Sequence, residues 1–364
     1  MTQIRVPKGS RGNRRATILL CAIALVAILT LAVLRVTSND SSKQTTTLDT
    51  DSWVYSMVDN AGRVGEDSSI AIDSNDKVHM SYLNYTSYDL KYATNVDGAW
   101  ANYTLDSTGI VGQTSSIAVD SNNKLHISYS DGSNWNLKYA TNAEGAWADY
   151  TVASTGLGCF YTSIAVDSNN KVHISYYESV TSSLKYATNA EGSWDISSLD
   201  SCDGRTSITT DSGNHIHISY LAYAGAALKY ATNTSGSWAT YTLDESTGCI
   251  GMYSSIAADS DDHIHICYYD YMNANLKYVT NAEGSWTAYT LDSTGDVGQY
   301  SSIAVDSYDH VHISYWDFTN FQLKYAYDTE AIPEFGTAGA IVLIAVTMCI
   351  IVGLRRKLPS TKTE

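Results

Sequence analysis

The chain has 364 residues, with 28 tyrosines and 24 glycines but only four phenylalanines and three prolines. The scarcity of proline and a charged fraction of 16% argue against long disordered linkers. Amphipathic aromatics and turn-forming glycines favour a β-rich extracellular protein over a helical cytosolic one. Because the net charge of −16 repels phosphate backbones, we expect no nucleic-acid partner.

The first predicted elements are a basic segment over 1–15 and an apolar segment over 16–34. The apolar segment has 19 uncharged residues, which is enough to cross a hydrocarbon core at about 1.5 Å per residue. It is therefore a signal peptide or an uncleaved signal anchor. No small-x-small cleavage site follows, and Arg35 ends the run, so both alternatives stay open. Residues 35–51 are expected to be a linker.

From residue 52 onward one sequence unit repeats six times. The segment SSIAIDSNDKVHMSY, centred on Asp73, recurs around Asp120, Asp167, Asp211, Asp259 and Asp306. Each copy continues into an LKYATN-like segment, a Gly-x-Trp element and a YTLDSTG-like segment. Alternating apolar and polar residues predict a short strand for each segment, hence four strands per repeat. Repeats of this length predict an all-β fold, a six-bladed β-propeller over residues 52–328.

The repeats are out of phase with the chain ends. A tryptophan element follows the first five LKYATN-like segments, at Trp100, Trp147, Trp194, Trp238 and Trp286, but not the sixth. The missing element stands at the front, where Trp53 lies 47 residues before Trp100. We therefore expect the N-terminal segment to supply the outer strand of the last blade and to close the ring.

These repeats resemble the extracellular sialidase-like and BNR-type propeller repeats of bacterial and archaeal surface proteins. Those families carry an Asp-box of the form Ser-x-Asp-x-Gly-x-Thr-Trp, whereas this chain has the shorter Thr141–Trp147 turn at that place. The resemblance implies the propeller architecture and leaves the activity open, because a propeller hosts many functions.

A histidine recurs in every repeat, six residues after the recurring aspartate. We interpret these pairs as a structural network, because a feature common to all six blades serves the scaffold. The alternative is six metal sites, for which His215, His263 and His310 offer additional ligands in three blades only. We expect no metal and no cofactor.

Function is expected where the blades differ. One residue stands just before each inner strand and should surround the mouth of the central channel: Asp67, Thr114, Tyr161, Arg205, Tyr253 and Tyr300. Asp67 and Arg205 are three blades apart and should face one another across it. This set is the candidate ligand site.

Loops between the second and third strands add an aromatic residue followed by a carboxylate in three blades: Tyr177-Glu178, Tyr269-Asp270 and Trp316-Asp317. Such pairs stack on a sugar face and accept hydrogen bonds from its hydroxyls, although they are also compatible with ordinary loop aromatics. Arg63 and Arg205 are the only arginines between residues 36 and 331, too few for the arginine sets of sialidases or fucose lectins. A pair among the three carboxylates offers an alternative, general acid and base catalysis on a neutral polysaccharide.

Three cysteines, Cys159, Cys202 and Cys249, fall in inter-blade loops of the same face. One disulfide between neighbouring blades is expected in an oxidising exterior, with the pairing left open.

The C-terminal elements are a linker over 329–335, a transmembrane helix over 336–354 and a basic tail over 355–364. Ile332-Pro333-Glu334-Phe335 before the helix resembles the PEF-type sorting tails of archaeal surface proteins. That resemblance implies removal of the helix by a sortase; otherwise the helix is a stop-transfer anchor. Basic flanks at both ends predict a cell-membrane protein whose propeller lies on the extracellular side. Asn-x-Ser/Thr sequons, for example at Asn233, suit an exported glycoprotein.

The sequence thus predicts a membrane-anchored recognition or adhesion module for glycans or surface proteins. Two alternatives remain: an enzyme acting on polysaccharides, either a carboxylate-based hydrolase or a lyase, and a purely structural envelope protein.

Overall fold

The computed structural model describes residues 56–154, 156, 158–222, 227–245 and 250–328. These residues form an all-β unit of 22 strands. The predicted segments 1–15, 16–34, 35–51, 329–335, 336–354 and 355–364 lie outside the described residues, as does Trp53. Within the described ranges, no helix has the length and apolarity needed to cross a membrane.

The strands form antiparallel sheets in which each strand pairs with the next one along the chain. Two sheets have four strands and precede residue 154: β1 (Val64–Ile72), β2 (Val78–Asn84), β3 (Asp89–Thr94), β4 (Ala101–Asp106), then β5 (Val111–Val119), β6 (Leu125–Asp131), β7 (Asn136–Thr141), β8 (Ala148–Ala153). The last two sheets are β16 (Ile250–Ala258), β17 (Ile264–Asp270), β18 (Asn275–Thr280), β19 (Thr287–Asp292), and the three-stranded β20 (Val297–Val305), β21 (Val311–Asp317), β22 (Gln322–Tyr327).

The middle of the chain forms two blades that share one long strand. The strands are β9 (Cys159–Val166), β10 (Val172–Glu178), β11 (Ser183–Thr188), β12 (Asp195–Thr210), β13 (Ile216–Ala222), β14 (Leu228–Thr232) and β15 (Ala239–Asp244). The first half of β12 pairs with β11 as the outer strand of one blade, and its second half pairs with β13 as the inner strand of the next. The six repeats therefore give six blades, which we number 1 to 6 in chain order.

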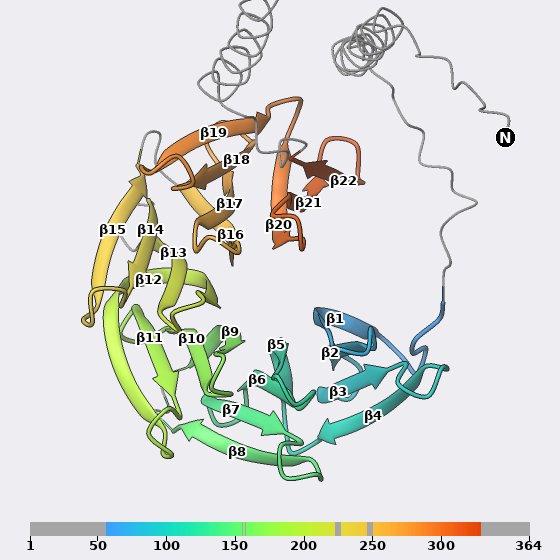
Figure 1. The fold of residues 1–364 in the computed structure, drawn as a ribbon. Helices are drawn as coiled ribbons and strands as arrows, with labels where there is room; N and C mark the ends of the chain where they lie inside the picture. Colours follow the sequence, from blue (N-terminus) through green and yellow to red (C-terminus); the bar gives the residue numbers. More distant parts are fainter. Residues whose placement is uncertain (1–55, 155, 157, 223–226, 246–249, 329–364) are drawn as a thin grey trace, which may run out of the picture. The chain divides into compact units, whose positions relative to one another are not determined.

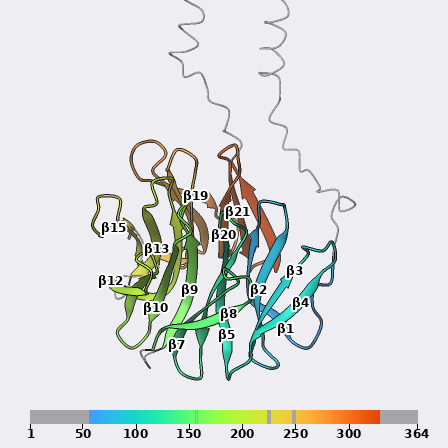
Figure 2. The same cartoon turned by 60° about the horizontal axis from the view of Figure 1, so that its bottom comes forward.

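The blades surround a central channel, with β1, β5, β9, β16 and β20 on its inner side (Figures 1 and 2). The ring is open between blade 6 and blade 1 (Figure 1). Leu323 of β22 is 78% exposed, whereas its counterparts in the other blades, such as Leu90, are fully buried. On the facing side Ile70 of β1 is 60% exposed, against 6% for its counterpart Ile117. The sequence predicted the blades and their order, and closure of the ring stays a prediction.

The apolar cores lie between neighbouring blades. Between blades 1 and 2, for example, Leu90 and Tyr92 pack with Ile117, Ile127 and Tyr129. Four of these cores are covered by a tryptophan whose indole packs on a tyrosine of the preceding blade. The ring-centroid distances are 5.1 Å for Trp147–Tyr92, 5.2 Å for Trp194–Tyr139, 4.9 Å for Trp238–Tyr186 and 5.0 Å for Trp286–Tyr230. We call these contacts the tryptophan slots.

The recurring aspartate and histidine form a buried network, as the sequence predicted. Asp73 Oδ1 accepts hydrogen bonds from the backbone N–H groups of Asn75 (2.8 Å) and Lys77 (2.9 Å), which closes the first hairpin turn. Asp73 Oδ2 lies 3.4 Å from His79 Nε2, and His79 Nδ1 lies 2.7 Å from the hydroxyl of Tyr92. Each aspartate therefore both shapes a turn and orients a histidine.

The additional histidines belong to the same network. Asp211 Oδ2 lies 2.8 Å from His215 Nδ1 and 3.1 Å from His217 Nε2, so one carboxylate oxygen serves two rings. His263 and His310 make the equivalent contacts with Asp259 and Asp306. Within the described ranges, no group of three or more His, Cys, Asp or Glu side chains is arranged to hold a metal ion.

A second network, which the sequence did not predict, connects most outer strands to the next blade. Its acceptors are the aspartates six residues after the tryptophan elements, which we call the latch aspartates: Asp59, Asp106, Asp200, Asp244 and Asp292. Asp106 Oδ2 accepts a hydrogen bond from the Tyr129 hydroxyl (2.9 Å) and pairs with the Lys138 ammonium. Although burial alone raises the pKa of Asp106, the hydrogen bonds from Lys138, the Thr108 N–H and Tyr129 hold that pKa below its ordinary value.

Blade 3 lacks this latch. Ala153 stands where the other blades have the aspartate, and the buried hydroxyl of Tyr176 has no hydrogen-bond partner among the described residues. The lysine of this blade, Lys185, turns to Glu178 instead, at 3.3 Å. Alanine at position 153 thus leaves the Tyr176 hydroxyl without an acceptor among the described residues, and Lys185 pairs with Glu178 instead of an aspartate.

Candidate ligand site at the channel mouth

A β-bulge at the start of each inner strand positions the six residues predicted to surround the channel, which we call the mouth ring. The register of β5 against β6 shifts between Gln113 and Ser116, and the other inner strands shift at the same place. Thr114 within this bulge has a left-handed backbone, with φ of 49°. Asp67, Tyr161, Tyr253 and Tyr300 share this conformation, with φ from 48° to 54°. A bulge changes the direction in which a side chain points, and the side chains of the mouth ring line the channel.

A glycine two residues earlier permits the bulge in several blades. Gly112 has φ of 87°, and a Cβ there would lie 2.7 Å from the Leu90 Cα. A Cβ on Gly298 would lie equally close to the Leu276 Cα of the preceding blade. No larger residue fits between these backbones.

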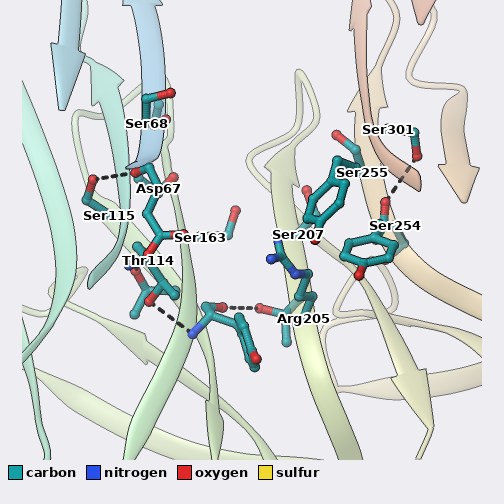
Figure 3. A pocket seen from close by; sticks show the side chains of 17 residues that line it. Asp67, Ser68, Thr114, Ser115, Ser163, Arg205, Ser207, Ser254, Ser255 and Ser301 are labelled. Atoms are coloured by element: carbon teal, nitrogen blue, oxygen red, sulfur yellow. Dashed lines mark hydrogen bonds between the residues drawn. The ribbon is translucent and has the colours of Figure 1, made fainter. Parts of the chain in front are cut away.

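Behind the mouth ring, a Ser-Ser-Ile or Thr-Ser-Ile motif in each inner strand connects neighbouring blades. Ser115 Oγ donates a hydrogen bond to the Asp67 carbonyl (3.1 Å), and Ser69 Oγ accepts one from the Ile117 N–H (3.2 Å). These serines and threonines also line the channel, whose cavity measures about 600 Å³ (Figure 3). The floor of the mouth is therefore hydroxyl-rich and held in place by backbone contacts.

Arg205 lies on one side of the mouth among three tyrosines. Its guanidinium carbon is 5.3 Å from the ring centroid of Tyr161, 4.9 Å from that of Tyr253 and 5.4 Å from that of Tyr300. Tyr253 and Tyr300 contact one another, with centroids 4.3 Å apart. Burial and the hydrogen bond with Tyr300 raise the pKa of Tyr253 to about 12, so it stays a neutral donor. Stacking orients the guanidinium, while its hydrogen-bond donors face solvent without a hydrogen-bond partner among the described residues.

Asp67 lies across the channel from Arg205 (Figure 3). Its Oδ2 accepts a hydrogen bond from the Thr114 N–H (3.0 Å), and the Thr114 hydroxyl in turn accepts one from the Tyr161 N–H (3.1 Å). In the part of the chain that the structure describes, no ion pair joins Asp67 to Arg205. The mouth therefore has an anionic and a cationic side, as the sequence predicted.

The mouth continues into a side groove of about 300 Å³. The groove shares Tyr161, Arg205, Tyr253 and Tyr300 with the channel and adds Asp203 and Met252. An extended ligand whose first unit lies at Arg205 thus has room for a second unit in this groove.

The aromatic–carboxylate pairs do not form the predicted acceptors. Glu178, Asp270 and Asp317 are 2–3% exposed. Asp270 Oδ1 and Asp317 Oδ1 accept hydrogen bonds from the N–H groups of Asn273 and Asn320, at 3.1 Å and 2.9 Å, which closes their turns. Glu178 contacts Lys185. These carboxylates are used within the fold, because a strand-end acid satisfies the turn that follows it; they offer no free pair for acid and base catalysis.

Their aromatic partners divide between the mouth and the rim. Tyr177 stacks on Tyr161, with centroids 6.5 Å apart, and Tyr269 lies 6.4 Å from Tyr253. Trp316 contacts the exposed Phe321 at 6.3 Å on the rim of blade 6. Tyr177 and Tyr269 thus support the mouth ring from behind, and Trp316 does not line the cavity.

Of the three cysteine pairings that the sequence left open, the one between Cys159 and Cys202 does not form. Cys202 is a fully buried free thiol, and its Sγ lies 3.5 Å from the Gly204 carbonyl. Burial raises its pKa to about 12, which makes it unreactive. Cys159 is buried in the separate core between blades 2 and 3, and Cys249 lies outside the described residues.

No protein-family model and no curated protein matches this sequence. Among solved structures, a protein of unknown function from Dyadobacter fermentans matches with a TM-score of 0.51 at 10% identity, covering 72% of this chain and 93% of that one. The α-L-arabinofuranosidase of Fusarium graminearum in complex with arabinobiose matches with a TM-score of 0.50 at 11% identity, covering 73% and 93%. Both likenesses show the fold, a β-propeller, and nothing further.

Proposed function

We propose that this protein is a six-bladed propeller held at the cell membrane by its terminal segments, with its mouth ring on the extracellular side binding glycans. The observation that carries the proposal is Arg205, stacked among three tyrosines beside a hydroxyl-lined cavity, with no hydrogen-bond partner for its donors among the described residues. A sugar needs an aromatic surface for its C–H face and fixed donors and acceptors for its hydroxyls. The mouth supplies both within about 600 Å³.

Charge favours a neutral glycan over a polyanion. Residues 36–331 contain 36 acidic and 12 basic residues, so the net negative charge of this segment repels acidic polymers. Arg205 then serves as a donor to sugar oxygens, and Asp67 as an acceptor on the opposite side. The Fusarium graminearum structure contains arabinobiose; for this chain, a glycan ligand is our proposal.

Glycan-array binding by the full-length protein in detergent micelles tests this function. We expect binding that Tyr300→Ala and Arg205→Ala each abolish or weaken at least about tenfold. Asn122→Ala provides the matched control, since Asn122 is exposed in a hairpin turn at the opposite end of the channel. Loss of binding in the control but not in the mouth variants would contradict the proposal.

Two further outcomes decide between the proposal and its alternatives. Release of products from a polysaccharide would favour a hydrolase or lyase over a binding module. If the protein binds no glycan on the array but selectively captures a surface protein, the proposed function changes from glycan recognition to protein recognition.

A further inference from the structure

The interface between blades 5 and 6 contains a cavity of about 670 Å³. It is lined by Tyr278 of blade 5 and by Val311, Ile313 and Ala326 of blade 6, together with polar groups at its edge. Tyr278 is half-buried, whereas its counterparts in blades 1 to 4 are at most 7% exposed.

This cavity corresponds to a tryptophan slot. Between blades 4 and 5, Trp286 contacts Tyr230 and packs against the core cluster that includes Ile264, Ile266 and Val279. In the repeat, Tyr230 corresponds to Tyr278, and the other three correspond to Val311, Ile313 and Ala326. Four equivalent slots thus contain an indole, and the fifth has the same walls around an open space.

Asp59 indicates which segment of the chain belongs there. Its Oδ2 accepts a hydrogen bond from the Tyr82 hydroxyl (2.8 Å) and lies 3.9 Å from Lys91 Nζ. Asp59 is therefore the latch aspartate that precedes blade 1, in the position that Asp106 occupies before blade 2. In every other blade that has a latch, the tryptophan stands six residues earlier; six residues before Asp59 is Trp53.

We propose that Trp53 fills the cavity between blades 5 and 6 and that residues 54–59 add to β22 as the fourth strand of blade 6. This inference rests on the walls of the cavity and on Asp59, and it holds whether or not the mouth binds glycans. The cavity and the edge of β22 are thus an acceptor for this chain's own N-terminal strand.

The register follows from blade 1. There Ala101 lies opposite Thr94, Tyr103 opposite Tyr92 and Asp106 opposite Leu90. Applied to the equivalent positions of blade 6, the same register places Val54 opposite Tyr327, Ser56 opposite Tyr325 and Asp59 opposite Leu323. Leu323, now 78% exposed, would become covered as Leu90 is.

A cysteine pair tests the register in the full-length protein in detergent micelles. Directly opposite residues of antiparallel strands have Cα atoms about 4.5–5.5 Å apart, within the range that a disulfide spans. Under mild oxidation Ser56→Cys with Tyr325→Cys should form an intrachain disulfide, seen as a faster monomer band on a non-reducing gel and as a linked peptide in mass spectra. Ser56→Cys with Lys324→Cys, one residue out of register and on the opposite face, is the matched control.

A monomeric cross-link in the first pair and not in the control supports the proposal. Equal cross-linking in both pairs, or none in the first, overturns it. A cross-linked dimer would assign the slot to the strand of a second copy and would also overturn it.

Thermal unfolding gives a second test that needs no cysteine. Trp53→Ala should lower the melting temperature as much as Trp286→Ala, because both remove an indole from the same kind of slot. An unchanged melting temperature in Trp53→Ala, beside a clear decrease in Trp286→Ala, contradicts the proposal.

Discussion

The inner strands combine a region that is nearly the same in every blade with a position that varies among the blades, one residue apart. Ser115 and Ser116 make the same backbone contacts with neighbouring blades as their counterparts elsewhere in the ring. The preceding position is Asp, Thr, Tyr, Arg, Tyr and Tyr in turn, on nearly the same bulged backbone in five blades. Contact with a neighbouring blade constrains a side chain, whereas contact with the channel does not. The variable position is therefore where a ligand can be selected without cost to the fold.

The largest effect should come from the repeated region. Trp286→Ala removes an indole packed 5.0 Å from the Tyr230 ring and leaves a cavity between blades 4 and 5. We expect a loss of about 3–5 kcal/mol in unfolding free energy. Denaturant unfolding measures it, with Trp135→Ala as the control, because Trp135 is 47% exposed and fills no slot. An equal loss in both variants would show that the slots do not hold the blades together.

The histidine network should come next. His217→Ala leaves the Tyr230 hydroxyl and Asp211 without a partner they contact in the fold. We expect a loss of roughly 1–3 kcal/mol in unfolding free energy, and no comparable effect of chelators on the unaltered protein. If the unaltered protein bound a transition metal stoichiometrically and His217→Ala lost that binding, the histidines would be metal ligands instead.

The same network predicts how stability depends on pH. Burial lowers the pKa of His126, His173 and His217 below the ordinary value near 6.5. The unfolded chain therefore binds protons at these sites before the folded chain does, so stability is full above about pH 7 and falls as the pH decreases through 6.

A second decrease should follow below about pH 4, where the latch aspartates protonate. Burial raises the pKa of Asp200, but the Lys229 and Tyr220 hydrogen bonds outweigh it and lower the pKa overall. Melting temperatures between pH 3 and 8 test both steps. A flat profile from pH 8 to 5 would contradict the first.

Ala153→Asp should stabilise the protein, because it restores the missing latch. The new carboxylate would accept a hydrogen bond from the Tyr176 hydroxyl and lie close to Lys185. Asp106 makes the same two contacts with Tyr129 and Lys138. We expect a gain of about 1 kcal/mol, measured as a rise in melting temperature. Ala153→Asn supplies a neutral acceptor at the same position. Comparing the two variants separates the contribution of the hydrogen bond from that of the negative charge. A decrease in both variants would show that the blade has repacked around alanine.

Repetition explains how much of this could be predicted. Six copies identified the blades, and the residue before each inner strand identified the mouth ring, because a propeller brings equivalent positions to the same end of the channel. Glu178, Asp270 and Asp317 were misassigned, since an acid at a strand end serves a ligand or its own turn and sequence does not distinguish them. The latch aspartates could have been found from their six-residue spacing after each tryptophan. The cluster around Arg205 depends on rotamers in four different blades, which no periodicity encodes.

The smallest effect on stability should come from the mouth ring, where Tyr300→Ala is the sharpest probe. Tyr300 is 58% exposed, and its ring contacts Tyr253 and the Arg205 guanidinium. Removing it should change the unfolding free energy by less than about 0.5 kcal/mol, as for other surface positions. Once a glycan ligand is identified, the same change should weaken its affinity at least about tenfold, or about 1.4 kcal/mol, because an exposed aromatic anchor is lost. Titration calorimetry beside a thermal melt gives both values on one sample. A large loss of stability in Tyr300→Ala would mean that the ring supports the blades after all, and that fold and recognition are not separated at this position.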